Sequence, residues 1–147
     1  MTIGLFSCGE SGKTIDKPTG GNAPKDIKLI PGQGTDLQFS HLTMEFKPVI
    51  SGDTIKAVYP FKNTTQTSQV IKEVVVSCPC MHTDYPKGNI QPGQIGEITV
   101  KFATAGQSGR HEKIIAVVLE GNQDPISLRL NGQINLDPNA APPAVQH

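Results

Sequence analysis

Apolar and polar residues alternate with a period of two along much of the chain, a pattern typical of β-strands that bury one face. The alternation is clear over residues 41–46 and 55–62, and it returns over 98–102 and 126–136. Antiparallel strands commonly face the core on one side and solvent on the other. We therefore expect these four segments to be half-buried antiparallel strands.

Residues 70–76 and 114–119 are instead nearly continuous apolar runs that are rich in β-branched side chains. Such runs favour strands covered on both faces, so we expect both to be central strands. Turn signals separate the predicted strands at Ser51-Gly52-Asp53, Asn63-Thr64-Thr65, Pro92-Gly93, residues 106–109 and Gly121-Asn122. Short strands at this spacing predict an all-β fold, an immunoglobulin-like antiparallel β-sandwich of about seven strands.

The strand pattern places one folded domain at residues 37–136, which fits a chain of 147 residues. Residues 9–36 are rich in Gly, Pro and polar side chains and carry no sustained apolar period. Such a composition cannot offset the entropy of ordering, so it predicts a flexible tether. Residues 137–147 contain three prolines and predict an irregular tail.

The charge balance narrows the classes of partner. Lys and Arg total 13 and Asp and Glu total 13, so the formal net charge is zero. A protein that neutralises a phosphate backbone needs a basic excess, so we expect no nucleic-acid partner. No stretch approaches the roughly 18 apolar residues of a membrane-spanning helix. Membrane association is therefore expected only through a lipid anchor.

The candidate anchor is Cys8, because Leu5-Phe6-Ser7-Cys8 resembles a lipobox and a Gly-rich polar stretch follows it directly. The charged and apolar regions of a complete export signal are not in the chain, so we interpret residues 1–8 as the remnant of a lipoprotein signal. The alternative is an unpaired cysteine in a disordered arm. Lipidation of Cys8 predicts a bacterial cell-envelope protein, in the periplasm or at the outer membrane.

The cluster Cys78-Pro79-Cys80-Met81-His82 carries the most chemistry in the chain. Its thiolates, thioether and imidazole suit Cu(I), or Zn²⁺ with added ligands, although structural zinc sites usually space their cysteines by roughly two to four residues. In an oxidising compartment the two thiols could instead form a disulfide or pair with another chain. Alternatively, Cys78 ends a buried strand as a small apolar residue while Cys80 lies in a loop.

An ordered series of motifs spans the predicted domain. An aromatic strand ends in Asn (Phe61-Lys62-Asn63), an apolar strand leads into Ser-Cys-x-Cys (residues 74–80), and Pro92-Gly93 precedes the strand at 98–102. Later members of the series are Gly109, residues 114–118, Asn122, Leu128, Leu130 and Gly132. From about Phe39 to Ile134 the series resembles the bacterial Ig-like proteins of the domain of unknown function 1573, relatives of hydin-type (ASH) and major-sperm-protein-like domains.

This resemblance implies an exported, non-enzymatic module that is often a lipoprotein, and it names no ligand or partner. The family usually has Gly between its cysteines and Thr after them, whereas this chain has Pro79 and Met81. Proline fixes its own φ angle and lacks a backbone donor, so the loop departs from the family's usual geometry at this point.

No nucleophile with an oriented base stands out in the sequence, so we expect no enzyme activity and no catalytic residues. Our leading hypothesis is a non-catalytic binding or scaffold module, tethered at the cell envelope, that recognises a protein or surface glycan through loops or a strand edge. The alternative is a copper- or thiol-handling protein that uses Cys78, Cys80, Met81 and His82. We therefore expect no cofactor under the leading hypothesis, and Cu(I) enters only with the alternative.

Overall fold

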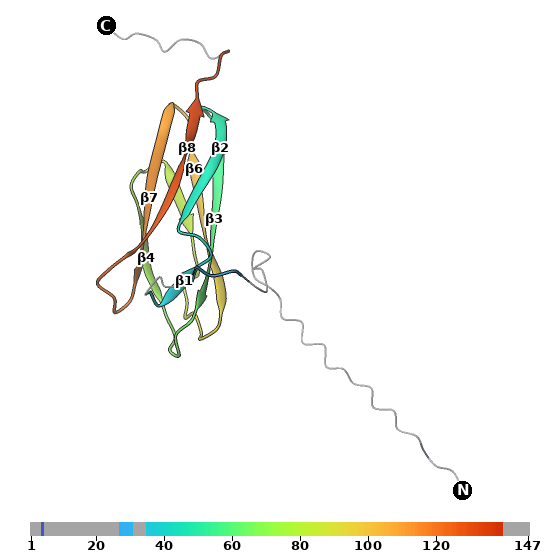
Figure 1. Cartoon of the computed structure of the whole chain (residues 1–147), viewed down its shortest axis with the longest axis vertical. Helices are drawn as coiled ribbons and strands as arrows, with labels where there is room; N and C mark the ends of the chain where they lie inside the picture. Colours follow the sequence, from blue (N-terminus) through green and yellow to red (C-terminus); the bar gives the residue numbers. More distant parts are fainter. Residues whose placement is uncertain (1–3, 5–26, 31–34, 140–147) are drawn as a thin grey trace.

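The computed structural model describes residue 4, residues 27–30 and residues 35–139. These residues form eight β-strands in two facing sheets, and no helix occurs among them (Figure 1). The strands are β1 (Leu37–Phe39), β2 (Thr43–Ile50), β3 (Thr54–Asn63), β4 (Ile71–Val76), β5 (Met81–Asp84), β6 (Ile95–Ala103), β7 (Gly109–Leu119) and β8 (Ile126–Asn135). The predicted all-β, immunoglobulin-like sandwich is confirmed. Two short edge strands, β1 and β5, join the strands that the alternation predicted.

The first sheet has the strand order β1-β3-β6-β5 and the second has the order β2-β8-β7-β4. All pairings are antiparallel except that of β2 with β8, which is parallel. The exception arises because the chain leaves the first sheet after Phe39 and enters the second sheet at Thr43 without reversing direction. The antiparallel sandwich thus contains one parallel pair, which no local pattern in the sequence could show.

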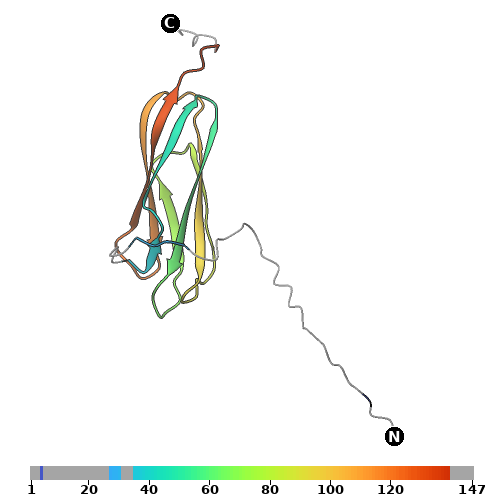
Figure 2. The ribbon, with the colours of Figure 1, turned by 45° about the vertical axis from the view of Figure 1, so that its right-hand side comes forward.

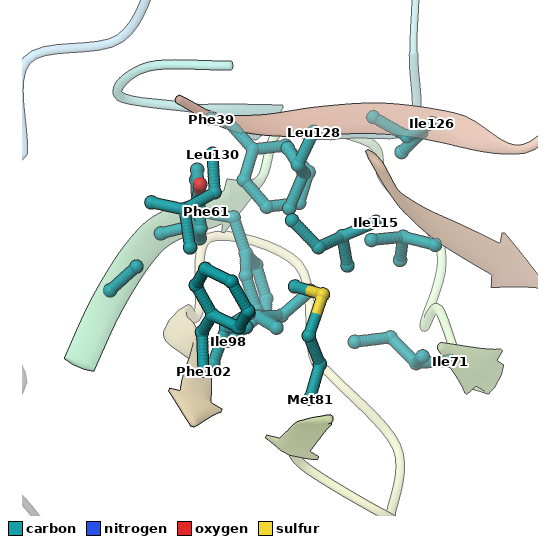
Figure 3. Close-up of a cluster of buried hydrophobic side chains, with 14 of the residues drawn as sticks. Phe39, Phe61, Ile71, Met81, Ile98, Phe102, Ile115, Ile126, Leu128 and Leu130 are labelled. Atoms are coloured by element: carbon teal, nitrogen blue, oxygen red, sulfur yellow. The ribbon is translucent and has the colours of Figure 1, made fainter. Parts of the chain in front are cut away.

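The core lies between the two sheets and is built from the predicted inward-facing positions. On β3, for example, Ile55, Ala57, Tyr59 and Phe61 are all buried, and their neighbours along the strand are more exposed. Figure 3 shows side chains from β1, β3, β6 and β8 meeting in this layer, with Phe39 and Phe61 among them. The two rings pack with their centroids 5.5 Å apart. The alternating segments therefore face the core as predicted.

The two continuous apolar runs differ from one another. β7 is a central strand, flanked by β8 and β4, as predicted. The prediction for β4 was wrong, because β4 lies at the edge of the second sheet. In the described part of the chain nothing covers the outer face of the second sheet, so Val75 on β4 is 48% and Ile114 on β7 is 42% exposed, and neither strand is covered on both faces, contrary to the prediction. The side chains of Lys72 and Glu73 are exposed too. An apolar run indicates a strand but does not say how many neighbours the strand has.

The sandwich is elongated, and its two ends are distinct (Figure 2). At the β1 end, Leu37 pairs with Asn63, and the N–H of Ile30 donates to the C=O of Phe39 at 3.2 Å. Ile30, within the predicted tether, is therefore hydrogen-bonded to β1. At the other end, called here the β6–β7 end, Thr54 pairs with Ala103 and Gly109 pairs with Ile134.

Candidate functional site

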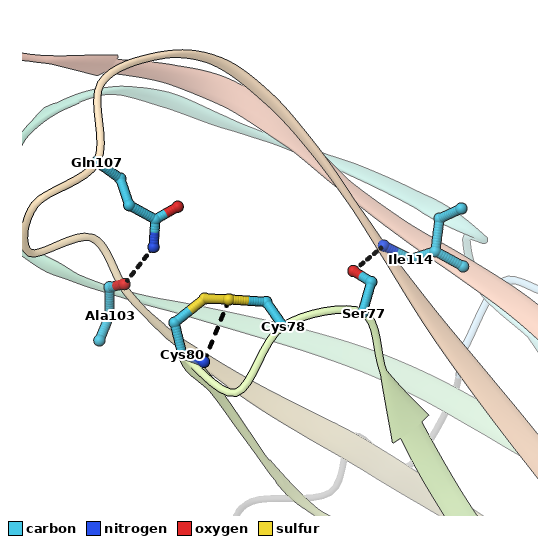
Figure 4. Close-up of a disulfide and its surroundings, with 6 residues drawn as sticks. All are labelled: Ser77, Cys78, Cys80, Ala103, Gln107 and Ile114. Atoms are coloured by element: carbon cyan, nitrogen blue, oxygen red, sulfur yellow. Dashed lines mark hydrogen bonds between the residues drawn. A yellow bond between two sulfur atoms is a disulfide. The ribbon is translucent and has the colours of Figure 1, made fainter.

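The cysteine pair lies in the loop of residues 77–80, which carries the chain from β4 in the second sheet to β5 in the first. Cys78 and Cys80 form a disulfide with their Cα atoms 5.2 Å apart (Figure 4). Both residues are half-buried, and Pro79 between them is exposed. Of the alternatives left open by the sequence, this structure therefore contains the disulfide.

Backbone hydrogen bonds hold the disulfide loop to both sheets. The N–H of Ser77 donates to the C=O of Ile114 at 3.2 Å, and the N–H of Ile114 donates to Oγ of Ser77 at 3.2 Å. On the other side, the N–H of Ala103 donates to the C=O of Cys80 at 3.0 Å. Figure 4 shows the disulfide between the Ser77–Ile114 contact and the turn that carries Gln107.

Two more contacts lie within the disulfide loop. The N–H of Met81 donates to the C=O of Cys78 at 3.2 Å, which closes a tight turn. The N–H of Cys80 donates to Sγ of Cys78 at 3.2 Å. The two sulfur atoms are therefore inequivalent, because one of them accepts a hydrogen bond from the loop's own backbone.

The structure does not bring the predicted ligands Cys78, Cys80, Met81 and His82 together. Met81 is only 4% exposed and points into the core beside Phe102 and Ile98 (Figure 3). His82 follows it on β5 and faces the opposite side of the first sheet, where it is exposed. Among the described residues, no group of three or more His, Cys, Asp or Glu side chains could hold a metal ion. The metal hypothesis stays a prediction about the reduced loop.

Two basic residues that pack near the start of β5, His111 and Lys113, were not predicted as a pair from the sequence. His111 and Lys113 lie on the inward-facing side of β7, in phase with the buried Ile115. Both approach Phe102, with the His111 ring centroid 6.3 Å and Nζ of Lys113 5.3 Å from the centroid of the Phe102 ring. Phe102 in turn pairs with Met81. The inward orientation of both residues could have been predicted from the sequence, because they lie at alternate positions in phase with the apolar residues that follow them.

Cys8 lies outside the described residues, so its predicted lipidation is not addressed by the structure. Within the part of the chain that is described, no helix is long and apolar enough to cross a membrane.

Two facing sheets of mixed pairing, joined by short turns, define an immunoglobulin-like β-sandwich module. A family model described as "Protein of unknown function (DUF1573)" matches residues 37–134. The chain belongs to this family, as the ordered motifs predicted. No curated protein matches the chain.

Solved structures share the fold at low sequence identity. The ASH / PapD-like domain 7 of human CEP192 has a TM-score of 0.56 and 11% identity, over 80% of this chain and 99% of that domain. A protein of unknown function from Porphyromonas gingivalis has a TM-score of 0.56 and 12% identity, over 66% of this chain and 46% of that protein. This chain therefore matches about half the length of the P. gingivalis protein.

The secreted serine protease VesC from Vibrio cholerae is a further neighbour, with a TM-score of 0.55 and 11% identity. The match covers 75% of this chain and 25% of VesC. At these identities the three neighbours show the sandwich fold alone. The relation to ASH-type domains, expected from the sequence, is confirmed at the level of the fold.

Proposed function

We propose that this chain is a non-catalytic binding module of the bacterial cell envelope, and that it recognises a protein partner by pairing a strand of the partner with β4. The observation that carries this proposal is the free edge of β4. β4 pairs with β7 on one side, and no strand in the described part of the chain pairs with its other side. An exposed edge strand offers a row of unpaired backbone donors and acceptors to another chain.

The other three edges are less suited to strand addition. β1 and β5 have only three and four residues, and Ile30 already donates to Phe39 of β1. β2 contains Pro48, and its register shifts between Phe46 and Val49. Proline and irregular register are devices that discourage edge pairing. β4 contains no proline, and its pairing is regular from Glu73 to Val76.

The backbone N–H and C=O groups of β4 point alternately toward β7 and toward the free edge. Ser77 donates its N–H toward β7, and hydrogen-bonded pairs alternate along an antiparallel ladder. Val75 therefore also pairs toward β7, whereas Val74 and Val76 direct their N–H and C=O groups to the free edge. A partner strand would find two consecutive sets of backbone groups there.

The outer face next to this edge is apolar. Val75 is 48% exposed, and Ile114 on β7 is 42% exposed. Val75 pairs with the half-buried Ala116. A strand added at β4 would carry alternate side chains onto the same face, where apolar residues would cover Val75. Exposed charges at Lys72 and Glu73 flank this apolar patch. The free backbone groups beside Val75 favour a protein partner over a glycan, because a glycan has no peptide backbone to pair with them.

The envelope location rests on the lipobox-like Leu5-Phe6-Ser7-Cys8 and the polar stretch behind it. A lipid on Cys8 would tether the domain through its β1 end, leaving β4 accessible. The intact mass of the protein purified from its native membranes tests this part. A diacylglyceryl-type addition that maps to residues 1–13 supports the anchor, and an unmodified Cys8 thiol overturns it.

The edge is tested by Val75→Lys, which places a charge on the exposed face without disturbing the core. The matched control is Ile50→Lys, because Ile50 is also 45% exposed but lies on β2. Both variants should melt within a few degrees of the unaltered chain by circular dichroism. Affinity chromatography of native membrane extract should recover one protein with the unaltered chain and with Ile50→Lys, but not with Val75→Lys.

Hydrogen exchange on the recovered complex supplies the second readout. Bound partner should slow amide exchange at Val74 and Val76 at least tenfold, since these N–H groups would then pair with its strand. A partner that binds Val75→Lys equally well, or a complex that leaves both amides unprotected, overturns strand addition. Binding of a glycan rather than a protein would also contradict the proposal.

A further inference from the structure

We infer that the Cys78–Cys80 disulfide is a thiol–disulfide exchange site that passes electron pairs to and from the thiols of other proteins. Cys80 is the sulfur that an incoming thiolate attacks, and Cys78 is the sulfur that leaves. This activity does not depend on strand addition at β4, so either proposal can fail alone.

The first argument is that the disulfide adds little to the connections already present. It links residues two positions apart in the sequence, so it closes a very short loop. The segments on either side are already fixed by backbone hydrogen bonds, from Ser77 to Ile114 and from Ala103 to Cys80. A disulfide that stabilises a fold usually closes a long loop, because it then restricts the unfolded chain most.

The second argument is accessibility. The loop lies at the surface where the chain passes between the two sheet edges, Pro79 is exposed, and both cysteines are half-buried rather than enclosed. Exchange requires an attacking sulfur to approach along the axis of the S–S bond. Both cysteines pack against the core, but a disulfide that is only partly buried is more open to exchange than a fully enclosed one.

The third argument is the inequivalence of the two sulfur atoms. Cys78 Sγ already accepts the N–H of Cys80 at 3.2 Å, and this donor would stabilise a thiolate on Cys78 after reduction. Ser77 pairs with Ile114, the residue that follows Lys113 on β7. The Lys113 side chain faces inward with its ammonium 5.3 Å from the centre of the Phe102 ring, and Phe102 pairs with Met81 directly after the loop. An ammonium on this side of the loop favours the thiolate form further.

The carboxylates on the two strands that the loop connects, Glu73 on β4 and Asp84 on β5, are both exposed. His111 shares the inward face of β7 with Lys113. On the first sheet, His82 and Lys101 pair with one another and both are exposed on its outer face. Glu112 faces away from the core on β7 and pairs with Arg129 at 3.3 Å. In the described part of the chain, no carboxylate shares the inward face of β7 with Lys113.

The exchange balances as two displacements at sulfur. An external thiolate attacks Sγ of Cys80, the Cys78–Cys80 bond breaks, and Cys78 leaves as the thiolate. A second external thiolate then attacks the external sulfur of the mixed disulfide and releases Cys80 as a thiolate. The external pair loses two electrons and becomes a disulfide, while the protein gains two electrons and, on protonation, two thiols. The reverse sequence reduces an external disulfide.

The test equilibrates the full, folded chain in mixtures of reduced and oxidised glutathione, followed by alkylation and tryptic mass mapping. Cleavage after Lys72 and Lys87 isolates both loop cysteines from Cys8. We expect the loop to open and close reversibly in these mixtures. Cys78→Ser should accumulate glutathione on Cys80 at least fivefold more than Cys80→Ser accumulates it on Cys78.

The role of Lys113 as a positioning residue is tested by the pH dependence of alkylation of the reduced chain. Cys78 should react at a lower pH than Cys80. Lys113→Met should move the Cys78 profile to higher pH, Lys113→Arg should restore it, and the exposed control Lys101→Met should leave it unchanged. The inference is overturned if the loop opens only after the chain is unfolded, or if glutathione favours Cys78. Identical profiles for the two thiols would overturn the assignment of Cys78 as the leaving sulfur.

Discussion

The ring of Phe46 on β2 lies over Gly132 on β8, its partner in the parallel pair, and occupies the space that a side chain at position 132 would need. A Cβ built on Gly132 would overlap the Phe46 ring. The first sheet repeats the arrangement, because a Cβ on Gly96 would lie 2.6 Å from the Phe61 ring, across the β3–β6 pair. In both sheets an aromatic ring therefore packs directly on a glycine of the neighbouring strand.

Gly132→Ala should consequently destabilise the domain. The new methyl group forces Phe46 or the β2–β8 pair to move, and overpacking of this kind costs about 2–3 kcal/mol. Denaturant unfolding followed by fluorescence or circular dichroism measures the change. The matched control is Gly88→Ala, where nothing lies within 4 Å of the added Cβ, and it should change the free energy of unfolding by less than about 0.5 kcal/mol. Equal effects of the two substitutions would contradict the packing described here.

The side chain of Asn63 is buried with every polar atom paired. Its Nδ2 donates to the C=O of Thr67 at 2.8 Å and of Ile90 at 2.9 Å, and its Oδ1 accepts the N–H and hydroxyl of Thr65. The predicted turn at Asn63-Thr64-Thr65 is thus organised by the first of its residues.

Asn63→Asp should lower the free energy of unfolding by about 2–4 kcal/mol at neutral pH, since it removes both donors and buries a carboxylate against two carbonyl groups. Part of the loss should return at acidic pH, where the carboxyl group is protonated. Asn122→Ala serves as the control, because Asn122 is exposed and its side-chain amide donates to the carboxylate of Asp36. A variant whose stability equals that of the unaltered chain would refute the role assigned to Asn63.

The hydroxyl of Tyr59 on β3 donates to the C=O of Arg129 on β8 at 2.7 Å and so connects the two sheets. Burial raises the pKa of this hydroxyl above the usual tyrosine value of about 10. Tyr59→Phe should cost about 1–2 kcal/mol at neutral pH, because the carbonyl loses its partner.

The same raised pKa predicts a pH dependence. Both folded and unfolded chains hold the proton below about pH 10, so the contribution of Tyr59 is fully present there. Above that pH the unfolded chain ionises first, and the contribution declines. The stability difference between the unaltered chain and Tyr59→Phe should therefore shrink as pH rises past 10, as measured by paired urea titrations. A difference that stays constant across this range would argue against a buried hydroxyl.

Removing the disulfide should cost the domain little. For a loop as short as that between Cys78 and Cys80, chain entropy gives about 1.5 kcal/mol. The double variant Cys78→Ala/Cys80→Ala should therefore fold, with a melting temperature lowered by only a few degrees. Failure to fold would show that the disulfide is needed to hold the sandwich together.

The copper hypothesis now makes a sharper prediction than the sequence allowed. Because Met81 is buried in the core, it can bind Cu(I) only if β5 detaches from β6. In a competition titration of the reduced chain, Met81→Leu should leave the Cu(I) affinity unchanged, whereas replacing both cysteines should abolish binding. A large loss of affinity in Met81→Leu would indicate that the loop opens to form a four-residue site.

The strands with a clean period of two could be predicted, because one buried face imposes that period on residues such as Ile98, Val100 and Phe102. The edge position of β4 could not be predicted, since an apolar run has the same composition whether one strand or two pair with it. The parallel pairing of β2 with β8 depends on contacts some 85 positions apart, such as Met44 with Leu130, and leaves no local signal.

The candidate site, too, could be predicted only in part from the sequence. The sequence identified the cysteines but left their state open, because spacing alone does not distinguish a disulfide from a ligand pair. The alternation that places Met81 inward and His82 outward was readable from the strand period once β5 was recognised, but a strand of four residues has too few positions to be recognised. The position of Lys113 relative to the loop could not be predicted, because it depends on the pairing of β4 with β7, which only the fold supplies.

The start of β1 and the end of β8 lie at opposite ends of the sandwich, which has a practical consequence for experiments. β1 begins at one end of the sandwich, whereas β8 finishes at the β6–β7 end, where Asn135 pairs with Ile50 (Figure 1). Ala103, which contacts the disulfide loop, belongs to that same end. A sensor chip or affinity resin coupled through the amino-terminal side thus leaves the loop facing the bulk solution, whereas carboxy-terminal coupling turns the loop toward the support.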